Sequence, residues 1–158
     1  WSLCVWIAIT SAEPKKIGST EGMEHTRLTS PFYTAWTQSA SSATPQAVRA
    51  ILQKDFEQLA TLAEESCLRM HAVMMSAGPG LIYWTPTTLS IIHAIRILRQ
   101  QGTPVFFTID AGPQVKVICL PEYAQHVYNA LKDIPGIQQL LQVGMGPGVH
   151  SVTHEQSI

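Results

Sequence analysis

The sequence is poor in charged residues and has no long apolar run, and each shortage excludes a class of protein. Only 13% of the 158 residues are charged, and 10 Lys and Arg side chains are balanced by 11 Asp and Glu side chains. No basic surplus therefore exists to neutralise the phosphates of a nucleic acid. The longest apolar run, residues 3–9, is far shorter than the roughly 20 residues of a membrane-spanning helix. Because 46% of the residues are hydrophobic, disorder of the whole chain is also excluded. We expect a single domain over residues 1–158, with neither a nucleic acid nor a membrane as its partner.

Cysteine and histidine are too scattered to suggest a disulfide framework or a metal site. The three cysteines, Cys4, Cys67 and Cys119, form no C-x-x-C pair, and the six histidines share no ligand spacing on one predicted element. Free cysteines are typical of a reducing compartment, so we expect a cytoplasmic protein with no metal ligands among these residues. The chain begins with Trp1 and enters an apolar stretch at once, without the flanks of a signal peptide. We therefore expect a piece of a longer protein, with residues missing upstream.

Hydrophobic periodicity predicts the order strand, helices, strand, strand, helix, strand. Short apolar or β-branched runs are predicted as strands at residues 3–10, 105–109, 115–120 and 138–143. Turn residues separate the second and third runs, so these two are expected to form a hairpin. The order matches the split βαβ pattern. We therefore predict an α+β fold, a ferredoxin-like split βαβ sandwich with a helical insertion after the first strand.

The predicted insertion contains short helices and one long apolar stripe. Residues 19–30 and 31–38 are predicted as two short helices, followed by a linker of small residues at 39–43. Thr44 is then predicted to cap a new helix that has Pro45 at its first position. In the next helix, six apolar residues recur at helical spacing and are predicted to face the core: Phe56, Leu59, Ala63, Cys67, Met70 and Met74. A further helix, which starts at residue 86, is expected to bury Leu89, Ile92, Ile95 and Leu98.

One acidic residue stands out because of its place in this pattern. Asp110 follows the apolar run at residues 105–109 and precedes the turn formed by Ala111, Gly112 and Pro113. A carboxylate there is expected at the rim of the sheet, beside small residues that leave room for a ligand. Apolar neighbours would limit the access of water, which suits a proton acceptor. The alternative is a turn aspartate that bonds its own backbone, and the residues alone favour this structural interpretation.

Five segments of the chain are similar to motifs of one known enzyme family. Residues 110–113 are similar to the family's Asp-Ala-Gly-Pro-Asn segment, and residues 16–23 to its Lys-x-x-x-Ser-x-x-Gly-Met stretch. Residues 29–33 match Thr-Ser-Pro-Phe-Tyr, residues 70–72 match a Met-His-Ala helix, and residues 83–86 resemble Tyr-Trp-Ser-Pro. The matches occur in order along nearly the whole chain. The chain therefore resembles the mevalonate diphosphate decarboxylases, a family of the GHMP kinase superfamily.

The resemblance implies the GHMP-type carboxyl-terminal domain of an ATP-dependent carboxy-lyase of the mevalonate pathway of isoprenoid biosynthesis. Such an enzyme converts mevalonate 5-diphosphate to isopentenyl diphosphate, CO2, ADP and phosphate. Asp110 matches the family's catalytic aspartate, which would orient or deprotonate the tertiary 3-hydroxyl of the substrate. The turn residues Ala111, Gly112 and Pro113 would then lie near the substrate.

The resemblance also implies cofactors and partners. ATP and Mg²⁺ would be bound mainly by an amino-terminal ATP- and substrate-binding domain, which is missing from this chain. The 158-residue piece alone is therefore expected to be inactive. Family members are commonly homodimers, so a second copy is an expected partner beside the amino-terminal half of the same enzyme.

Several other polar residues are given structural roles. His71 lies on a helix that is mainly core, and Thr29 and Ser30 are expected to end a helix. Arg96 and Arg99 are interpreted as the solvated end of their helix, where cations interact favourably with the helix dipole.

Two positions depart from the family pattern, and two other functions stay open. Gln114 replaces the usual Asn, so the geometry of the turn is expected to differ, and residues 78–80 are Gly-Pro-Gly where relatives tend to have Pro-Pro. The chain has no P-loop motif, and the glycine-rich segment 144–148 is interpreted as a turn before a short tail strand. One alternative is the carboxyl-terminal domain of another GHMP small-molecule kinase. The other is a non-catalytic ferredoxin-like module that binds a ligand at the Asp110 turn.

Overall fold

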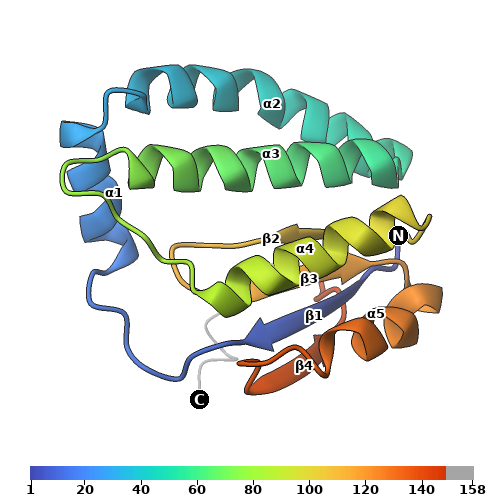
Figure 1. Cartoon of the computed structure of the whole chain (residues 1–158). Coiled ribbons are helices and arrows are strands. Elements are labelled where there is room, and N and C mark those ends of the chain that lie inside the picture. The colour runs from blue at the N-terminus through green and yellow to red at the C-terminus, as the bar shows by residue number, and fades with distance from the viewer. Residues whose placement is uncertain (149–158) are drawn as a thin grey trace, which may run out of the picture.

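The computed structural model describes residues 1–148 and contains one antiparallel sheet of four strands. The strands are β1 (Cys4–Ile9), β2 (Val105–Thr108), β3 (Val115–Cys119) and β4 (Gln139–Val143). Their order in the sheet is β2-β3-β1-β4, with β1 paired to both β3 and β4. Helix α4 (Pro86–Gln100) precedes β2, and α5 (Ala124–Leu131) connects β3 to β4 (Figure 1). This is the split βαβ arrangement, so the predicted α+β, ferredoxin-like fold is confirmed.

The insertion after β1 consists of the helices α1 (Ser19–Thr29), α2 (Tyr33–Gln53) and α3 (Phe56–Met75). The long helices α2 and α3 lie side by side, with α3 between α2 and the sheet (Figure 1). Two predictions are wrong here, because residues 39–43 and Pro45 both lie inside α2. Small hydroxyl residues resemble a linker, but in this helix their hydroxyls bond carbonyls of the preceding turn. Ser41 Oγ, for example, donates to the Thr37 carbonyl at 3.2 Å.

The main core lies between one face of the sheet and the two helices α4 and α5. Its fully buried members include Ala8, Ile91, Ile95, Val105, Phe107, Val115, Val117, Cys119, Val127 and Leu131. In α4 the predicted stripe is confirmed except for Leu89, which is 45% exposed, while Ile91 is buried instead. Each large aliphatic side chain buried in this way contributes roughly 1.5–3 kcal/mol to stability. The core therefore fixes α4 on the sheet, and with it the start of β2.

Helix α3 contributes to the cores on both faces of the sheet because it lies along β2, the edge strand. Phe56 and Ala60 pack with Phe106 on the face opposite the main core. About two turns further along α3, Cys67 joins the main core together with Ile109. An edge strand exposes peptide groups that need partners. The position of α3 along β2 allows its side chains to provide them.

The apolar stripe predicted for α3 is partly wrong. Leu59, Ala63 and Met70 are only half-buried, whereas Glu64 and His71 are buried with exposed fractions of 8% and 1%. Periodicity of apolar residues places a helix face by assuming that polar side chains face solvent. Here two polar side chains face the protein interior, because Glu64 bonds a peptide group of β2 and His71 bonds the carbonyl of Ile109, just after β2.

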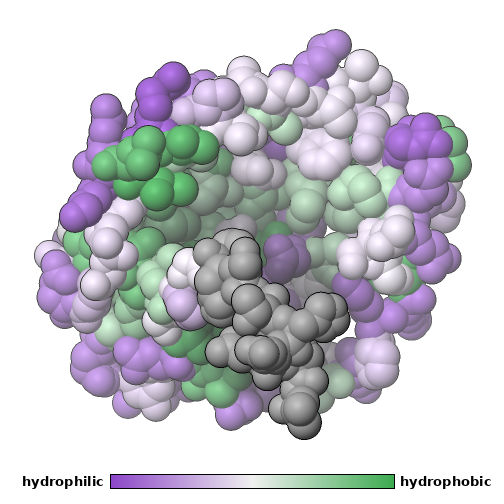
Figure 2. All heavy atoms as spheres, turned by 180° about the vertical axis from the view of Figure 1, so that it is seen from behind, coloured by the Kyte–Doolittle hydropathy of each residue, from purple (hydrophilic) through white to green (hydrophobic). Residues whose placement is uncertain are grey.

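The low content of charged residues leaves many large apolar side chains on the surface. Those that expose more than half of their area are Leu28, Phe32, Val48, Ile51, Leu52, Ile82, Ile97 and Met145. Seen from behind, apolar atoms gather in one area near the upper left, and hydrophilic atoms lie around the rim (Figure 2). None of the helices in residues 1–148 is both long enough and apolar enough to cross a membrane.

Candidate functional site

Asp110 lies two residues after the end of β2, at the start of the turn that leads into β3. The predicted turn is confirmed, and the Gly112 N–H donates to the Asp110 carbonyl at 2.7 Å. The Asp110 carboxylate forms an ion pair with the ammonium group of Lys116 on β3. The expectation that apolar neighbours limit the access of water is wrong for this chain. The side chain of Asp110 is 83% exposed, because its neighbour Ile109 points into the core and the carboxylate lies at the surface.

Asp110 lines a hollow of about 310 Å³ between its own turn and the loop after β1. The lining residues are Glu13, Lys15, Asp110, Ala111, Gly112, Pro113, Gln114 and Lys116. The three turn residues predicted to lie near a substrate therefore share one hollow with the predicted catalytic carboxylate. A second hollow of about 380 Å³ adjoins the first, since Glu13, Lys15 and Pro113 line both, and Lys16 lines the second. Carboxylate and ammonium groups thus stand together in a place that a polar, anionic ligand can reach.

Gln114 clamps the turn to the end of β1. Its side-chain amide accepts the Thr10 N–H at 2.6 Å and donates to the Ser11 carbonyl at 2.5 Å. Because Pro113 has no N–H, ordinary ladder pairing between β1 and β3 stops there, and the Gln114 side chain continues it. The Thr10 hydroxyl also donates to the Pro113 carbonyl at 3.1 Å. The glutamine that departs from the family pattern therefore has a defined structural role in this chain.

Lys15 connects the loop after β1 to the same turn. Its Nζ donates to the Ala111 carbonyl at 2.7 Å and lies 3.5 Å from Ser19 Oγ at the start of α1. An ammonium group has three N–H donors, so one donor remains for a ligand. Lys15 and Lys116 line the hollow, although they were not predicted as site residues from the sequence. The sequence did contain an indication for Lys116, because it is a charged residue within an apolar strand. Strand alternation places it on the face opposite Val115 and Val117.

Side chains of α3 hold the strand that leads to Asp110. Glu64 Oε1 accepts the Phe107 N–H at 3.3 Å, and Cys67 Sγ donates to the Ile109 carbonyl at 3.6 Å. His71 Nε2 lies 3.3 Å from the same carbonyl. Burial lowers the pKa of His71, so its ring is neutral near pH 7, and Nε2 carries the proton because a carbonyl only accepts. Burial also raises the pKa of the Cys67 thiol to about 11, which keeps it a neutral donor.

Arg99 of α4 provides the charge partner of Glu64. The two side chains lie 2.9 Å apart, and the side chain of Arg99 is only 25% exposed. The interpretation of Arg99 as a solvated residue is therefore wrong, whereas Arg96 is exposed as expected. Burial raises the pKa of Glu64, and the guanidinium of Arg99 opposes this effect. The pair extends the set of contacts that fixes β2 from α3 to α4.

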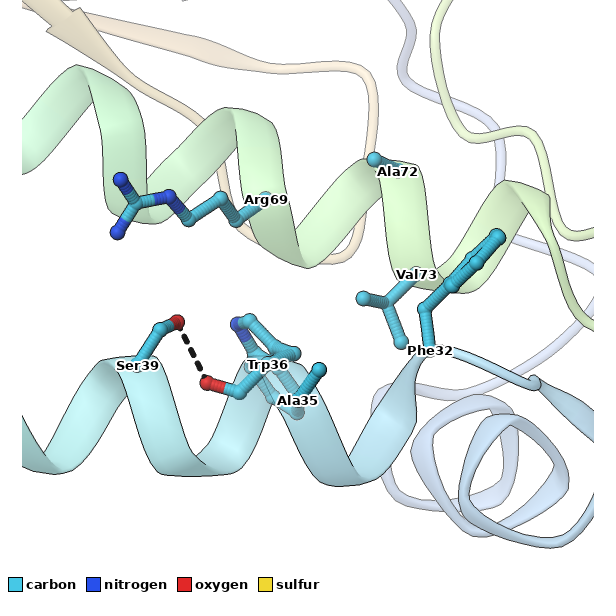
Figure 3. A pocket seen from close by; sticks show the side chains of 7 residues that line it. All are labelled: Phe32, Ala35, Trp36, Ser39, Arg69, Ala72 and Val73. Atoms are coloured by element: carbon cyan, nitrogen blue, oxygen red, sulfur yellow. Dashed lines mark hydrogen bonds between the residues drawn. The ribbon is translucent and has the colours of Figure 1, made fainter.

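A third hollow, of about 270 Å³, lies between α2 and α3, away from Asp110 (Figure 3). It is lined by Phe32, Ala35, Trp36, Ser39, Arg69, Ala72 and Val73. Of its polar groups, the Ser39 hydroxyl already donates to the Trp36 carbonyl at 2.7 Å, and Arg69 pairs with Glu65 at 2.6 Å. The lining offers no acid or base for proton transfer.

The remaining predicted features have plain structural outcomes. Thr29 ends α1 and Ser30 caps it, as expected. The segment 144–148 is exposed loop, and the expected tail strand lies outside the described residues. Within residues 1–148, no cluster of three or more His, Cys, Asp or Glu side chains could hold a metal ion.

Comparison with known proteins agrees with this fold. The family model for the mevalonate 5-diphosphate decarboxylase C-terminal domain matches residues 5–156. A diphosphomevalonate decarboxylase of Candida albicans is 30% identical over 93% of this chain and 46% of its own length. The human diphosphomevalonate decarboxylase is 32% identical over 76% of this chain and 31% of its own length. The chain therefore spans less than half the length of these relatives.

Solved structures of the same family superimpose on the chain. Mevalonate diphosphate decarboxylase from Staphylococcus aureus has a TM-score of 0.82 and 31% identity, over 89% of this chain and 42% of its own. The protein MDDEF, in complex with MVAPP, AMPPCP and magnesium, has a TM-score of 0.81 and 32% identity. That similarity covers 89% of this chain and 43% of MDDEF. From the family model, the relatives and the shared fold together, the chain belongs to the family of mevalonate 5-diphosphate decarboxylase C-terminal domains.

Proposed function

We propose that this chain is the carboxyl-terminal part of an ATP-dependent decarboxylase. The enzyme converts mevalonate 5-diphosphate and ATP to isopentenyl diphosphate, CO2, ADP and phosphate. The observation that carries the proposal is the placement of Asp110 with Lys15 and Lys116 around one hollow at the end of β2. Family membership supports it, as does the complex of the relative MDDEF with MVAPP, AMPPCP and magnesium.

The domain organisation is part of the same proposal. Residues 1–158 form a single carboxyl-terminal domain, and an amino-terminal domain that binds ATP and substrate belongs to the same protein. The support is the length of the relatives, which is more than twice that of the matched segment. The residues described in this chain include no cluster that suits Mg²⁺. In this proposal the amino-terminal domain therefore supplies the magnesium ligands, and no step at Asp110 depends on them.

Asp110 is the proposed catalytic residue. A tertiary alcohol is a poor nucleophile, and a carboxylate that accepts its hydrogen bond or proton makes phosphorylation of its oxygen easier. When the carboxylate accepts only the hydrogen bond, it stays ionised, and its negative charge would stabilise the electron-poor carbon formed as phosphate leaves. The high exposure of the carboxylate fits a half-site, because a second domain that closes over it would exclude water. Before such closure, the ion pair with Lys116 would hold the carboxylate at the hollow.

The lysines around the hollow are proposed to bind phosphate oxygens. Lys15 and Lys116 line the hollow of Asp110, and Lys16 lines the adjoining one. Lysine binds phosphate as a compact point charge, and the substrate carries a diphosphate. Binding in the two adjoining hollows would place the reacting hydroxyl and the charged end of the substrate in separate subsites. Positioning of this kind is the main contribution of a protein to phosphoryl transfer.

The test is Asp110→Asn in the full-length protein. Loss of the proton acceptor is expected to lower kcat by roughly 10²–10⁴-fold while KM changes by only a few fold. The assay measures CO2 release that depends on ATP. Asp133→Asn is the matched control, because Asp133 is an exposed carboxylate beside a lysine, Lys132, at 3.9 Å, and lies away from the hollow. A near-normal kcat in Asp110→Asn would remove Asp110 from the catalytic role.

The same assay tests the domain proposal. The 158-residue chain alone is expected to release no CO2, because the groups that would bind ATP lie on the amino-terminal domain. Turnover by the isolated chain would contradict that assignment.

We further propose a cytoplasmic homodimer. The support for the cytoplasm is that Cys4, Cys67 and Cys119 are all free and buried, which suits a reducing compartment. The support for the dimer is the family resemblance. Sedimentation of the full-length protein distinguishes a dimer from a monomer.

A further inference from the structure

Strand β2 lies at the edge of the described sheet, and its outer side has peptide groups that need partners. Within residues 1–148 it pairs with β3 alone. Peptide groups of successive residues point to opposite sides of a strand, so Phe107 and Ile109, which are two residues apart, present theirs to the same side. Both residues are buried, with exposed fractions of 0% and 1%. Buried peptide groups without partners are costly, so this edge must be satisfied by something other than water.

Helix α3 provides those partners with three side chains on one face. Glu64, Cys67 and His71 follow each other at helical spacings of three and four residues, which align them along the helix. Glu64 accepts the Phe107 N–H, and the other two bond the Ile109 carbonyl at the distances given above. In effect, a row of side chains takes the place of a fifth strand. The last peptide group that the row contacts is that of Ile109, one residue before Asp110.

We propose that His71 is a positioning residue for Asp110. The Ile109 carbonyl and the Asp110 nitrogen belong to one planar peptide unit, so a group that holds the carbonyl also sets the direction in which Asp110 leaves the sheet. His71 is the last member of the row and bonds that unit directly. The inference rests on the function proposed above, in which Asp110 is the catalytic carboxylate.

The surroundings of His71 suit a rigid support. Its ring lies 4.8 Å from the ring of Trp84, between centroids, and Trp84 directly precedes the residue that caps α4. The side chain is 1% exposed, so the ring is held by α3, by the segment before α4 and by the end of β2. A ring fixed on three sides loses little further freedom when it bonds a carbonyl. The position of the Ile109 carbonyl is therefore tied to the packed core rather than to the exposed turn.

The first test compares two variants of the full-length enzyme. His71→Leu keeps an apolar side chain of similar size but removes the donor, whereas His71→Gln keeps an N–H donor near the place of Nε2. His71→Leu is expected to lower kcat by about 10–100-fold with KM within threefold, and His71→Gln to recover kcat to within about threefold of the wild type. Equal losses in both variants would show that His71 serves packing only. A normal kcat in His71→Leu would also overturn the proposal.

The second test needs no activity and uses amide hydrogen exchange of the 158-residue chain. The Gly112 N–H, which bonds the Asp110 carbonyl, reports on the turn. Its exchange is expected to speed up at least tenfold in His71→Leu and to stay near the wild-type rate in His71→Gln. Leu131→Ala in the core of α5 is the control for general destabilisation. Its effect should be confined to amides that exchange only by global unfolding.

The two tests separate the failure of this inference from the failure of the proposed function. A full-length wild type without decarboxylase activity would refute the function, while hydrogen exchange at Gly112 would still decide whether His71 holds the turn. Unchanged exchange at Gly112 in His71→Leu would refute the positioning role, even in an active enzyme.

Discussion

Single side chains replace missing backbone partners at two places around Asp110. Gln114 continues the pairing of β1 with β3 past Pro113, and Glu64 pairs with the open edge of β2. Both bond peptide groups, which are costly to bury without a partner. The exposed carboxylate of Asp110 is therefore attached to a backbone that side chains hold on two sides. Rigid support of this kind is what a reacting group requires to stay aligned with its substrate.

Truncation of Gln114 tests the clamp at β1. Gln114→Ala is expected to lower the free energy of unfolding by about 1–2 kcal/mol, because the Thr10 N–H and the Ser11 carbonyl lose their partners. Gln114→Asn should also destabilise the chain, since an amide that is one methylene shorter cannot keep both bonds. Urea denaturation measures both. The control is Gln125→Ala on α5, where the amide bonds only the exposed Asn129. An unchanged midpoint in Gln114→Ala would show that the clamp adds nothing to stability.

Helix α2 shows how an element can continue through residues that usually end one. It spans Tyr33–Gln53 with Pro45 in its interior, where a proline leaves a carbonyl of the preceding turn without its helical partner. The helix packs along α3, and Ala50 on this side is fully buried. Packing against a neighbouring helix can outweigh the local cost of one proline.

Replacement of Pro45 tests whether α2 is continuous. Pro45→Ala is expected to raise the free energy of unfolding by about 1–3 kcal/mol, because alanine restores the missing backbone hydrogen bond at an exposed site. Urea denaturation measures the change, and Arg49→Ala, at another exposed position of the same helix, should have little effect. If Pro45 instead began a separate helix, its removal would lower stability, because proline is favourable at a first helical position.

For the whole molecule, two buried ionisable side chains make stability depend on pH. Most charged side chains are exposed, but His71 and Glu64 are buried at the edge of the sheet. Glu64 has Arg99 as its partner, whereas His71 stays neutral and bonds a carbonyl. Protonation of His71 would place a positive charge in the core. Protonation of His71 would therefore affect both the stability of the fold and the support of the proposed site.

Stability of the whole chain is expected to fall as the pH drops below about 6.5. Burial lowers the pKa of His71 in the folded state, so below that pH the unfolded chain binds protons that the folded chain does not. The free energy of unfolding then decreases with falling pH until the folded-state pKa is passed. Urea denaturation at several pH values between about 7.5 and 5 measures the slope. His71→Leu lacks this contribution and should show a flatter dependence, whereas equal slopes would contradict the assignment.

Local sequence patterns were sufficient for the strands, the hairpin and the position of Asp110. Alternation and apolar runs reflect contacts within a few residues, and the turn at Ala111, Gly112 and Pro113 depends on the conformations that these residues allow. The order of the predicted strands and helices likewise indicated the α+β fold, which the structure and its relatives confirm. Local patterns gave wrong predictions where one residue type occurs in two different structural settings. Serine and alanine in α2 resembled a linker, and the apolar stripe predicted for α3 did not include Glu64 and His71, which are buried.

Tertiary structure alone brought the parts of the site together. Lys15 reaches Ala111 across 96 positions of sequence, and Gln114 reaches Thr10 across 104. These contacts follow from the order of strands in the sheet, which puts the end of β1 beside the start of β3. The burial of His71 follows from the placement of α3 along an edge strand whose peptide groups needed partners. No local pattern encodes such needs, because they arise only when segments distant in sequence pack together and exclude water.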